Sequence, residues 1–223
     1  TVIDGAVELH NVQSISFAEH EGSYLVGMLA ALASKSGTVG FVGGMDIPLI
    51  RRFACGYEQG VKAVNPAATV LVNMAGTTPA AWSDPTRGAE LARSQFDRGA
   101  DVIFAAAGQT GMGALQAVKD AGRLSIGVDS NQNHLFPGSV LTSMVKRVDV
   151  AAYNAFKGAM DGTWTPGVRV LGLKDDGVAW ALDEHNQALI TEEMKARVGA
   201  AAEEIRTGTR TVANYDDAAG CAF

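Results

Sequence analysis

The residue best suited by its chemistry to bind a ligand is Asp129, which ends the apolar run LSIGVD (124–129). An ionised carboxylate at the end of a buried strand costs several kcal/mol unless it is paired or partly hydrated. Such a carboxylate can accept two hydrogen bonds from vicinal hydroxyls, or it can cap the turn that follows the strand. Lys146 follows the next apolar run, SVLTSMV (139–145), and three roles are open to it: pairing with Asp129, donating to a polar ligand, or lying on the surface.

Glycine-containing turns follow the other apolar runs, at Gly43-Gly44, Gly76 and Gly108–Gly111. Glycines there let a ligand approach the backbone, although a tight turn explains any single glycine better. We interpret Gly43-Gly44 as the end of a strand whose backbone borders a ligand cleft. Neither GGMDIP nor AGQTGMG matches a dinucleotide or phosphate-loop pattern, so no nucleotide-phosphate site is predicted.

The sequence shows no pattern typical of catalysis, of a metal site or of a bound cofactor. It contains no G-x-S-x-G sequence and no two carboxylates at the spacing of an acid–base pair. Its four histidines are scattered, without close Cys/His spacing. Cys55 and Cys221 are the only cysteines, and we do not expect a disulfide between a buried helix and a position near the end of the chain.

Composition and charge exclude two classes of function. The 24 Asp+Glu residues outnumber the 18 Lys+Arg residues, and the densest basic spots contain two residues each, at Arg51-Arg52 and Lys146-Arg147. A nucleic-acid-binding protein would show a basic patch or stripe, so nucleic acid is not an expected partner. No apolar run is long enough to cross a membrane, and the first ten residues do not form a signal peptide.

Short, nearly continuous apolar runs alternate with stretches of helical spacing. Continuous apolar strands indicate burial on both faces, and therefore a parallel sheet covered by helices on each side. The predicted class is α/β. Strands are predicted at 38–43, 69–75, 101–107, 124–129 and 139–145, and helices at 22–34, 47–64, 84–99 and 110–122.

The pattern changes after Val148. A helix is predicted at 148–162, two strands within 165–182 joined by a turn at Asp175–Gly177, and a helix at 190–208 that Thr191 can cap. The small, polar segment 214–223 is expected to fray.

Several blocks of sequence, in order, are similar to the BMP family of solute-binding lipoproteins of the purine-nucleoside receptor type. The blocks are EHEGSYLVGMLAA, GTVGFVGGMDIPLIRRFACGYEQGV, WSDPTRGAELARSQFDRGADVIFAAAGQTGMG, IGVDSNQN and LTSMVKRVD. The similarity is strong over residues 8–150 and weaker beyond them.

This resemblance implies a type I periplasmic-binding-protein fold, in which two α/β lobes enclose the ligand. By resemblance, the chain contains one complete lobe and a remnant of the other, and is an N-terminally shortened form. The expected division is a first-lobe remnant (1–18), the second lobe (19–142), a return helix (143–165), hinge strands with the C-terminal helix (166–211), and a tail (212–223). The implied location is extracytoplasmic, in the periplasm or at the cell surface, with membrane contact only through a lipid anchor absent from this chain.

The resemblance also implies which residues bind the ligand. Asp129 and Lys146 match family positions that hold a ribose, and Glu19 follows the first crossing between the lobes. Gly108 and Thr110 line the turn after strand 101–107. Phe53 either stacks on a base or is an ordinary core residue.

The expected function is that of a substrate-binding protein for an ABC importer, which takes a purine nucleoside and passes it to a permease without catalysis. Three alternatives remain at this stage. The ligand is another polar molecule, such as a sugar or vitamin-like compound; the chain is an α/β enzyme acting on a nucleoside or sugar, which requires a base near Asp129; or the shortened chain binds nothing and self-associates through exposed apolar surface.

Overall fold

The computed structural model describes residues 1–216 and residue 221. Its strands are β1 (Val2–Ile3), β2 (Gln13–Phe17), β3 (Thr38–Met45), β4 (Thr69–Gly76), β5 (Val102–Ala106), β6 (Leu124–Asp129), β7 (Val140–Lys146), β8 (Gly167–Leu171) and β9 (Val178–Trp180). Its α-helices are α1 (Glu19–Ala33), α2 (Pro48–Val64), α3 (Pro85–Asp97), α4 (Gly108–Asp120), α5 (Val148–Asp161) and α6 (Glu192–Arg206). Three short 3₁₀ helices are η1 (Pro79–Trp82), η2 (Asn133–Leu135) and η3 (Leu173–Asp175).

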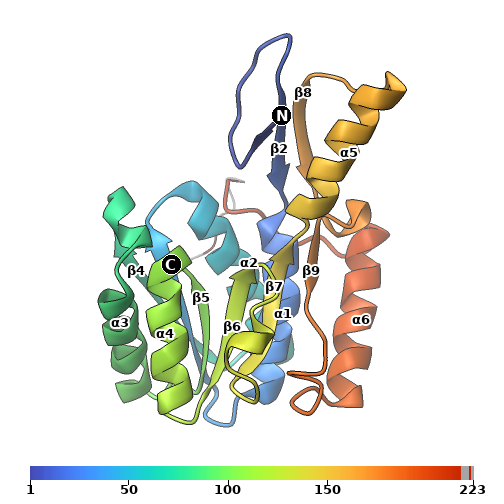
Figure 1. Ribbon diagram of the computed structural model, residues 1–223. Helices are drawn as coiled ribbons and strands as arrows, with labels where there is room; N and C mark the ends of the chain where they lie inside the picture. Colours follow the sequence, from blue (N-terminus) through green and yellow to red (C-terminus); the bar gives the residue numbers. More distant parts are fainter. Residues whose placement is uncertain (217–220, 222–223) are drawn as a thin grey trace.

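The strands form two sheets, which confirms the predicted α/β class. The large sheet has the order β4-β3-β5-β6-β7-β9 and is parallel except for β9, which pairs antiparallel with β7. The small sheet has the order β1-β2-β8 and is parallel throughout. Figure 1 shows the small sheet and α5 standing beyond the carboxyl ends of the large sheet's parallel strands.

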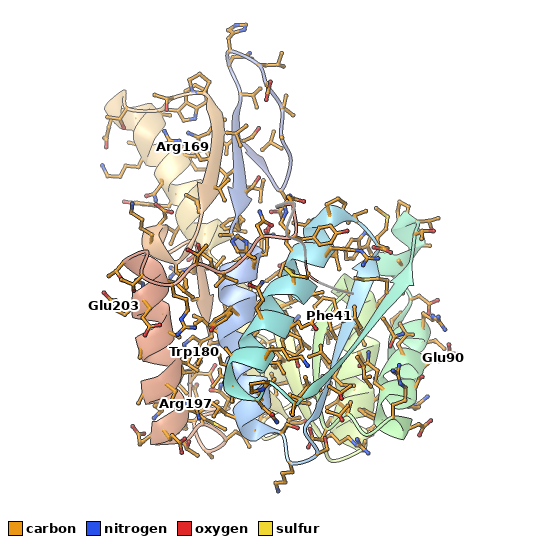
Figure 2. All side chains as sticks on the ribbon, turned by 180° about the vertical axis from the view of Figure 1, so that it is seen from behind. Phe41, Glu90, Arg169, Trp180, Arg197 and Glu203 are labelled. Carbon is orange, nitrogen blue, oxygen red and sulfur yellow. A yellow bond between two sulfur atoms is a disulfide. The ribbon has the colours of Figure 1, made fainter. Side chains whose placement is uncertain are left out.

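Helices cover both faces of the large sheet, as continuous apolar strands require. Figure 1 shows α3 and α4 on the face of the sheet toward the viewer. Figure 2, the view from behind, shows α1 and α2 on the opposite face, with α6 alongside α1. The core on the α1–α2 side contains four packed aromatic rings, of which Phe104 lies 5.4 Å from both Phe41 and Tyr57, and Phe53 lies 6.3 Å from Phe104. A β-carbon on Gly56 of α2 would lie 2.1 Å from the carbonyl oxygen of His20, so this glycine permits α1 and α2 to touch through their backbones.

Two expectations for the second half of the chain are only partly correct. The strands within 165–182 exist, but β8 joins the small sheet and β9 the large one, so they do not form a hairpin. The connection runs through η3 and a left-handed residue, Asp176 (φ 53°), and therefore carries the chain from one sheet to the other. The Thr191 cap forms as predicted, with its hydroxyl accepting from the Met194 N–H at 3.2 Å.

The cysteine prediction is wrong, because a disulfide joins Cys55 and Cys221 across a Cα–Cα distance of 5.3 Å. After α6 the chain returns to α2, where the Gln59 amide bonds both the N–H and the carbonyl of Ala213 at 2.9 Å. Local sequence patterns do not report such a return. The expectation of fraying does not hold for Asp216, which pairs with Arg52, or for Cys221; residues 217–220 and 222–223 lie outside the described residues.

Apolar side chains are exposed on the small-sheet end of the molecule. Phe156 and Met160 on α5 keep 76% and 88% of their accessible surface. Val168 and Val170 are also exposed, on the face of β8 opposite α5. Phe156 and Met160 lie four residues apart and therefore share one face of α5. Large exposed apolar side chains that cluster in this way typically mark an interaction site or cause aggregation.

We therefore expect the 223-residue chain to self-associate, with an elution volume on gel filtration that decreases as protein concentration rises. The variant F156E/M160E should elute as a monomer over the same range, because two carboxylates on α5 oppose apolar contact. A matched control is Q116E/Q187E, which adds the same charge at two other exposed positions. Concentration-independent elution of the parent chain would contradict this expectation.

Candidate functional site

An ammonium group surrounded by carboxylates lies where the two sheets meet. Lys146 ends β7, and its Nζ lies 2.5 Å from Asp4 Oδ2, 3.8 Å from Glu19 Oε1 and 4.0 Å from Asp129 Oδ1. Asp4 follows β1, Asp129 ends β6 and Glu19 begins α1. Asp4 and Asp129 both have positive φ, 57° and 65°, a region that few non-glycine residues adopt and in which Asp is over-represented.

Two aromatic rings lie close to the same ammonium. Lys146 Nζ lies 5.1 Å from the centre of the Phe17 ring and 6.0 Å from that of Phe53. A cation within about 6 Å of an aromatic face is attracted to it. The Lys146 side chain keeps only 4% of its accessible surface, so these contacts and the carboxylates replace most of its hydration.

Glu19 is the most strongly perturbed carboxyl group of the cluster. Burial raises its pKa from 4.5 to about 7, although Lys146 and Arg52 both act to lower it. The side chain has no exposed surface, and Oε1 has no hydrogen-bond partner among the described residues. Arg52 Nη1 approaches the other oxygen, Oε2, at 3.5 Å.

Asp129 is the most exposed of the three carboxylates in the cluster. Its side chain keeps 62% of its accessible surface. Desolvation by the surrounding protein raises its pKa, Lys146 lowers it, and Asp4 raises it further. A carboxylate that is partly desolvated yet reachable is suited to accept hydrogen bonds from a ligand.

A cavity of about 180 Å³ opens beside this cluster. Its lining combines apolar and charged groups: Asp4, Leu49, Ile50, Phe53, Trp82, Ala106, Ala107, Gly108, Val128, Asp129 and Lys146. An outer, more open pocket continues along Trp82, Gly108 and Asp129 to Gln109, Met112 and Gln132. Pockets with apolar and aromatic walls and a few placed polar groups are typical of small-molecule sites.

The structure places four of the six predicted site residues in this cavity wall: Phe53, Gly108, Asp129 and Lys146. Glu19 lies against Lys146 but does not line the cavity. Thr110 is fully buried, and its hydroxyl accepts from the Asp84 N–H at 2.8 Å and donates to the Ala81 carbonyl at 2.7 Å. Thr110 therefore holds the turn that carries Trp82 and does not itself line the cavity.

Sequence reasoning missed Asp4 and Trp82, and it misread the glycine pair. Strand β3 continues to Met45, and a β-carbon on Gly44 would lie 2.2 Å from Trp82 Cζ3. Gly44 thus makes room for the indole ring and does not itself line the cavity. The position of Trp82, just after β4 at the carboxyl edge of the sheet, was the available signal; nothing local marks Asp4.

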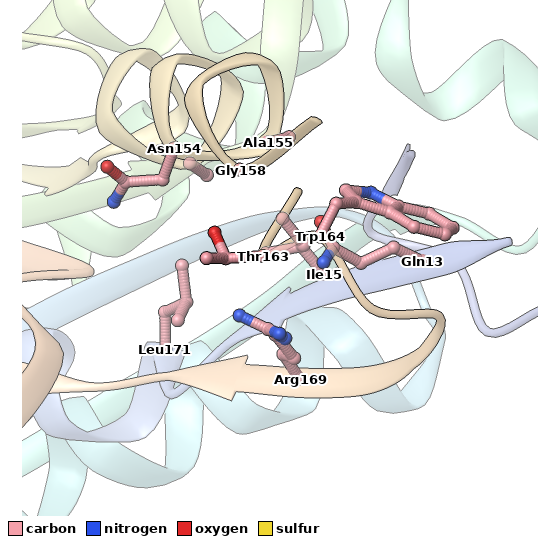
Figure 3. A pocket seen from close by; sticks show the side chains of 10 residues that line it. Gln13, Ile15, Asn154, Ala155, Gly158, Thr163, Trp164, Arg169 and Leu171 are labelled. Carbon is pink, nitrogen blue, oxygen red and sulfur yellow. The ribbon is translucent and has the colours of Figure 1, made fainter. Parts of the chain in front are cut away.

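A second cavity, of about 110 Å³, lies between α5 and the small sheet (Figure 3). Its polar groups already hold the segment after α5, since Gln13 Nε2 donates to the Thr165 carbonyl at 2.9 Å and Arg169 Nη2 to the Thr165 hydroxyl at 2.6 Å. The cluster around Lys146 is therefore the better candidate. Among the residues that the structure describes, no set of three His, Cys, Asp or Glu side chains is arranged so that it could hold a metal ion, and none of the helices has the length and hydropathy of a membrane span.

Comparison with known proteins identifies the family. A family model described as "ABC transporter substrate-binding protein PnrA-like" matches residues 1–211. Basic membrane protein D of Borreliella burgdorferi is 38% identical over 189 residues, which cover 82% of this chain and 53% of that protein. The ABC transporter nucleoside-binding protein BmpA of Lactococcus lactis is 32% identical over 230 residues, which cover 95% of this chain and 63% of that protein.

A solved structure agrees with these matches. An ABC transporter system solute-binding protein from Aeropyrum pernix K1 superposes with a TM-score of 0.84 at 28% identity, over 97% of this chain and 71% of that one. This chain spans 53% and 63% of the lengths of the two curated relatives. The chain belongs to the Bmp family of PnrA-like ABC transporter substrate-binding proteins.

Proposed function

We propose that the cavity beside Lys146 binds a nucleoside, with the sugar at Asp129 and Lys146 and the base against Trp82 and Phe53. The observation that carries this proposal is the pairing of Asp129 and Lys146, 4.0 Å apart, in one cavity wall. Together they offer an acceptor and a donor to adjacent hydroxyl groups. The name of the Lactococcus relative supports the same ligand class.

The charge of the site favours a nucleoside over a nucleotide. Three carboxylates lie within 4.0 Å of one ammonium, so an added phosphate would meet like charges. Asp4 and Asp129, the two carboxylates that line the cavity, can accept hydrogen bonds from neutral hydroxyl and amino groups. We infer that the ligand is uncharged.

The placement of the cavity supports a role for two lobes. The large sheet with its helices contributes Asp129 and Lys146, while Asp4 comes from the small sheet. We propose that residues 19–142 form most of one lobe and that residues 1–18 and the helix within 143–165 belong to another, with residues 166–211 spanning the hinge. Ligand would then be enclosed between them and passed to an ABC permease.

We place this function outside the cytoplasmic membrane, where substrate-binding proteins meet their permeases. The Cys55–Cys221 disulfide supports this location, because disulfides form and persist in oxidising compartments. Catalysis is not part of the proposal. Glu19 has a pKa suited to a general base, but its side chain has no exposed surface and does not line the cavity.

Isothermal titration calorimetry with guanosine, inosine and adenosine tests the proposal, on the longest natural polypeptide that contains the chain. We expect binding of at least one nucleoside, weaker binding of its 5′-monophosphate, and a loss of about 10- to 100-fold in the D129N variant, because a charge-assisted acceptor is removed. D97N, at an exposed carboxylate of α3, is the matched control. No heat from folded protein at millimolar nucleoside would refute the proposal, and heat from a free sugar alone would favour a sugar-binding protein.

A further inference from the structure

The C-terminal segment of the chain contacts α2 through one covalent and several polar links. We define the clasp as residues 213–216 and Cys221 together with these links. The disulfide holds Cys221 to Cys55, the Gln59 amide brackets Ala213, and Arg52 Nε donates to Asp216 Oδ2 at 2.8 Å. Arg51 adds a fourth contact, with its guanidinium 5.9 Å from the Tyr215 ring centre.

These contacts follow one face of the helix. Arg52, Cys55 and Gln59 are separated by three and four residues, the spacing at which side chains share a helix face. Phe53 points elsewhere, into the cavity beside Lys146. The clasp and the cavity therefore lie against the same two turns of α2.

Arg52 connects the clasp to the candidate site. Its guanidinium reaches Asp216 on one side and the buried carboxylate of Glu19 on the other, at 3.5 Å. Glu19 in turn lies 3.8 Å from Lys146, which lines the cavity. The ion pair with Asp216 already restricts the Arg52 side chain. Holding the Glu19 carboxylate in place therefore costs less additional side-chain entropy than it would for an arginine that is otherwise free.

We propose that the clasp positions Arg52 and Phe53 for ligand binding, by fixing the first turns of α2 against α1. Arg52 is a positioning residue in this arrangement, since it acts on Lys146 through Glu19 and does not line the cavity. The disulfide closes a loop with a sequence separation of 166 residues. Crosslinks over long loops restrict the unfolded chain strongly, so the clasp also stabilises the fold.

Hydrogen exchange measured by mass spectrometry on the ligand-free protein tests the mechanical part of this inference. In C55A/C221A we expect peptides covering residues 48–60 to exchange about tenfold faster, with α3 and α4 unchanged. Q59L and D216N weaken the clasp while the disulfide stays in place, so they report on it if the double variant folds poorly. D120N, at an exposed carboxylate of α4, is the matched control.

Calorimetry with the best-bound nucleoside tests the functional part, which rests on the proposed function. We expect affinity to fall about 5- to 20-fold in C55A/C221A, and in the same direction in D216N. Unchanged exchange over residues 48–60 would overturn the clasp, and faster exchange with unchanged affinity would overturn its positioning role. If the parent protein binds no nucleoside, the proposed function fails while the exchange comparison still decides the clasp.

Discussion

Replacing Lys146 by methionine is expected to abolish nucleoside binding and to lower the free energy of unfolding by about 3 kcal/mol at pH 8. The Lys146 ammonium is the group that Asp4, Glu19 and Asp129 share, and only 4% of the Lys146 side chain remains exposed to solvent. Without it, a buried carboxylate and two partly exposed ones would repel one another. The loss of stability should be smaller at pH 6, because Glu19 is then largely protonated and carries no charge that needs the ammonium.

Urea denaturation of K146M at pH 6 and pH 8, beside calorimetry with nucleoside, measures both effects. K119M is the control, since Lys119 is exposed and its one ion pair within the described part of the chain is with a neighbouring surface carboxylate, Asp120. The double variant K146M/E19Q should recover part of the stability but none of the binding. Full stability and parental affinity in K146M would contradict the assignment of Lys146 to the centre of the site.

Parts of this site could be predicted from sequence because strand direction determines them. Continuous apolar runs indicate a parallel sheet, and the carboxyl ends of parallel strands share one edge. Asp129 and Lys146 each end such a run, so their proximity follows without knowledge of any coordinates. Phe53 lies on α2, the helix that follows β3, and the structure shows that its side chain is both nearly buried and part of the cavity wall.

Asp4 and the disulfide, which sequence reasoning missed, both depend on contacts between distant segments. Asp4 reaches Lys146 across 142 residues, and the clasp brings residues 213–216 and Cys221 back to α2. Pattern reasoning works within windows of a helix or strand and has no access to such pairings. Gly44 shows how a local pattern can also mislead. A glycine at the end of a strand is consistent with close approach of a ligand, whereas here the missing side chain makes room for the ring of Trp82.

The prediction of a hairpin between β8 and β9 was wrong for a related reason. Two short strands separated by Asp-Asp-Gly are typical of a hairpin. Their true partners are β2 and β7, which precede them by more than 30 residues and lie in different sheets. Pairing preference between distant strands, rather than the local turn, decided the topology.

Glu19 should make the stability of the protein depend on pH between about 4.5 and 7. Burial raises its pKa from 4.5 to about 7 in the folded state, so the folded state binds more protons than the unfolded state between these values. The free energy of unfolding therefore falls as pH rises through this window, and the loss is complete above pH 7. A shift of this size corresponds to about 3 kcal/mol. The direction is opposite to that of a carboxylate stabilised by an ion pair, because desolvation outweighs Lys146 and Arg52.

The variant E19Q isolates this effect, since glutamine keeps the shape of the side chain and cannot ionise. Relative to the parent, E19Q should gain stability as pH rises from 5 to 8, by up to about 3 kcal/mol, measured as the difference in urea-unfolding free energies. E90Q, at an exposed glutamate of α3, controls for loss of one carboxylate from the surface. A parent–E19Q difference that stays constant across this range would show that Glu19 is ionised throughout. Lys146 and Arg52 would then stabilise its charge more strongly than burial opposes it, and the site would carry a permanent third negative charge against any ligand.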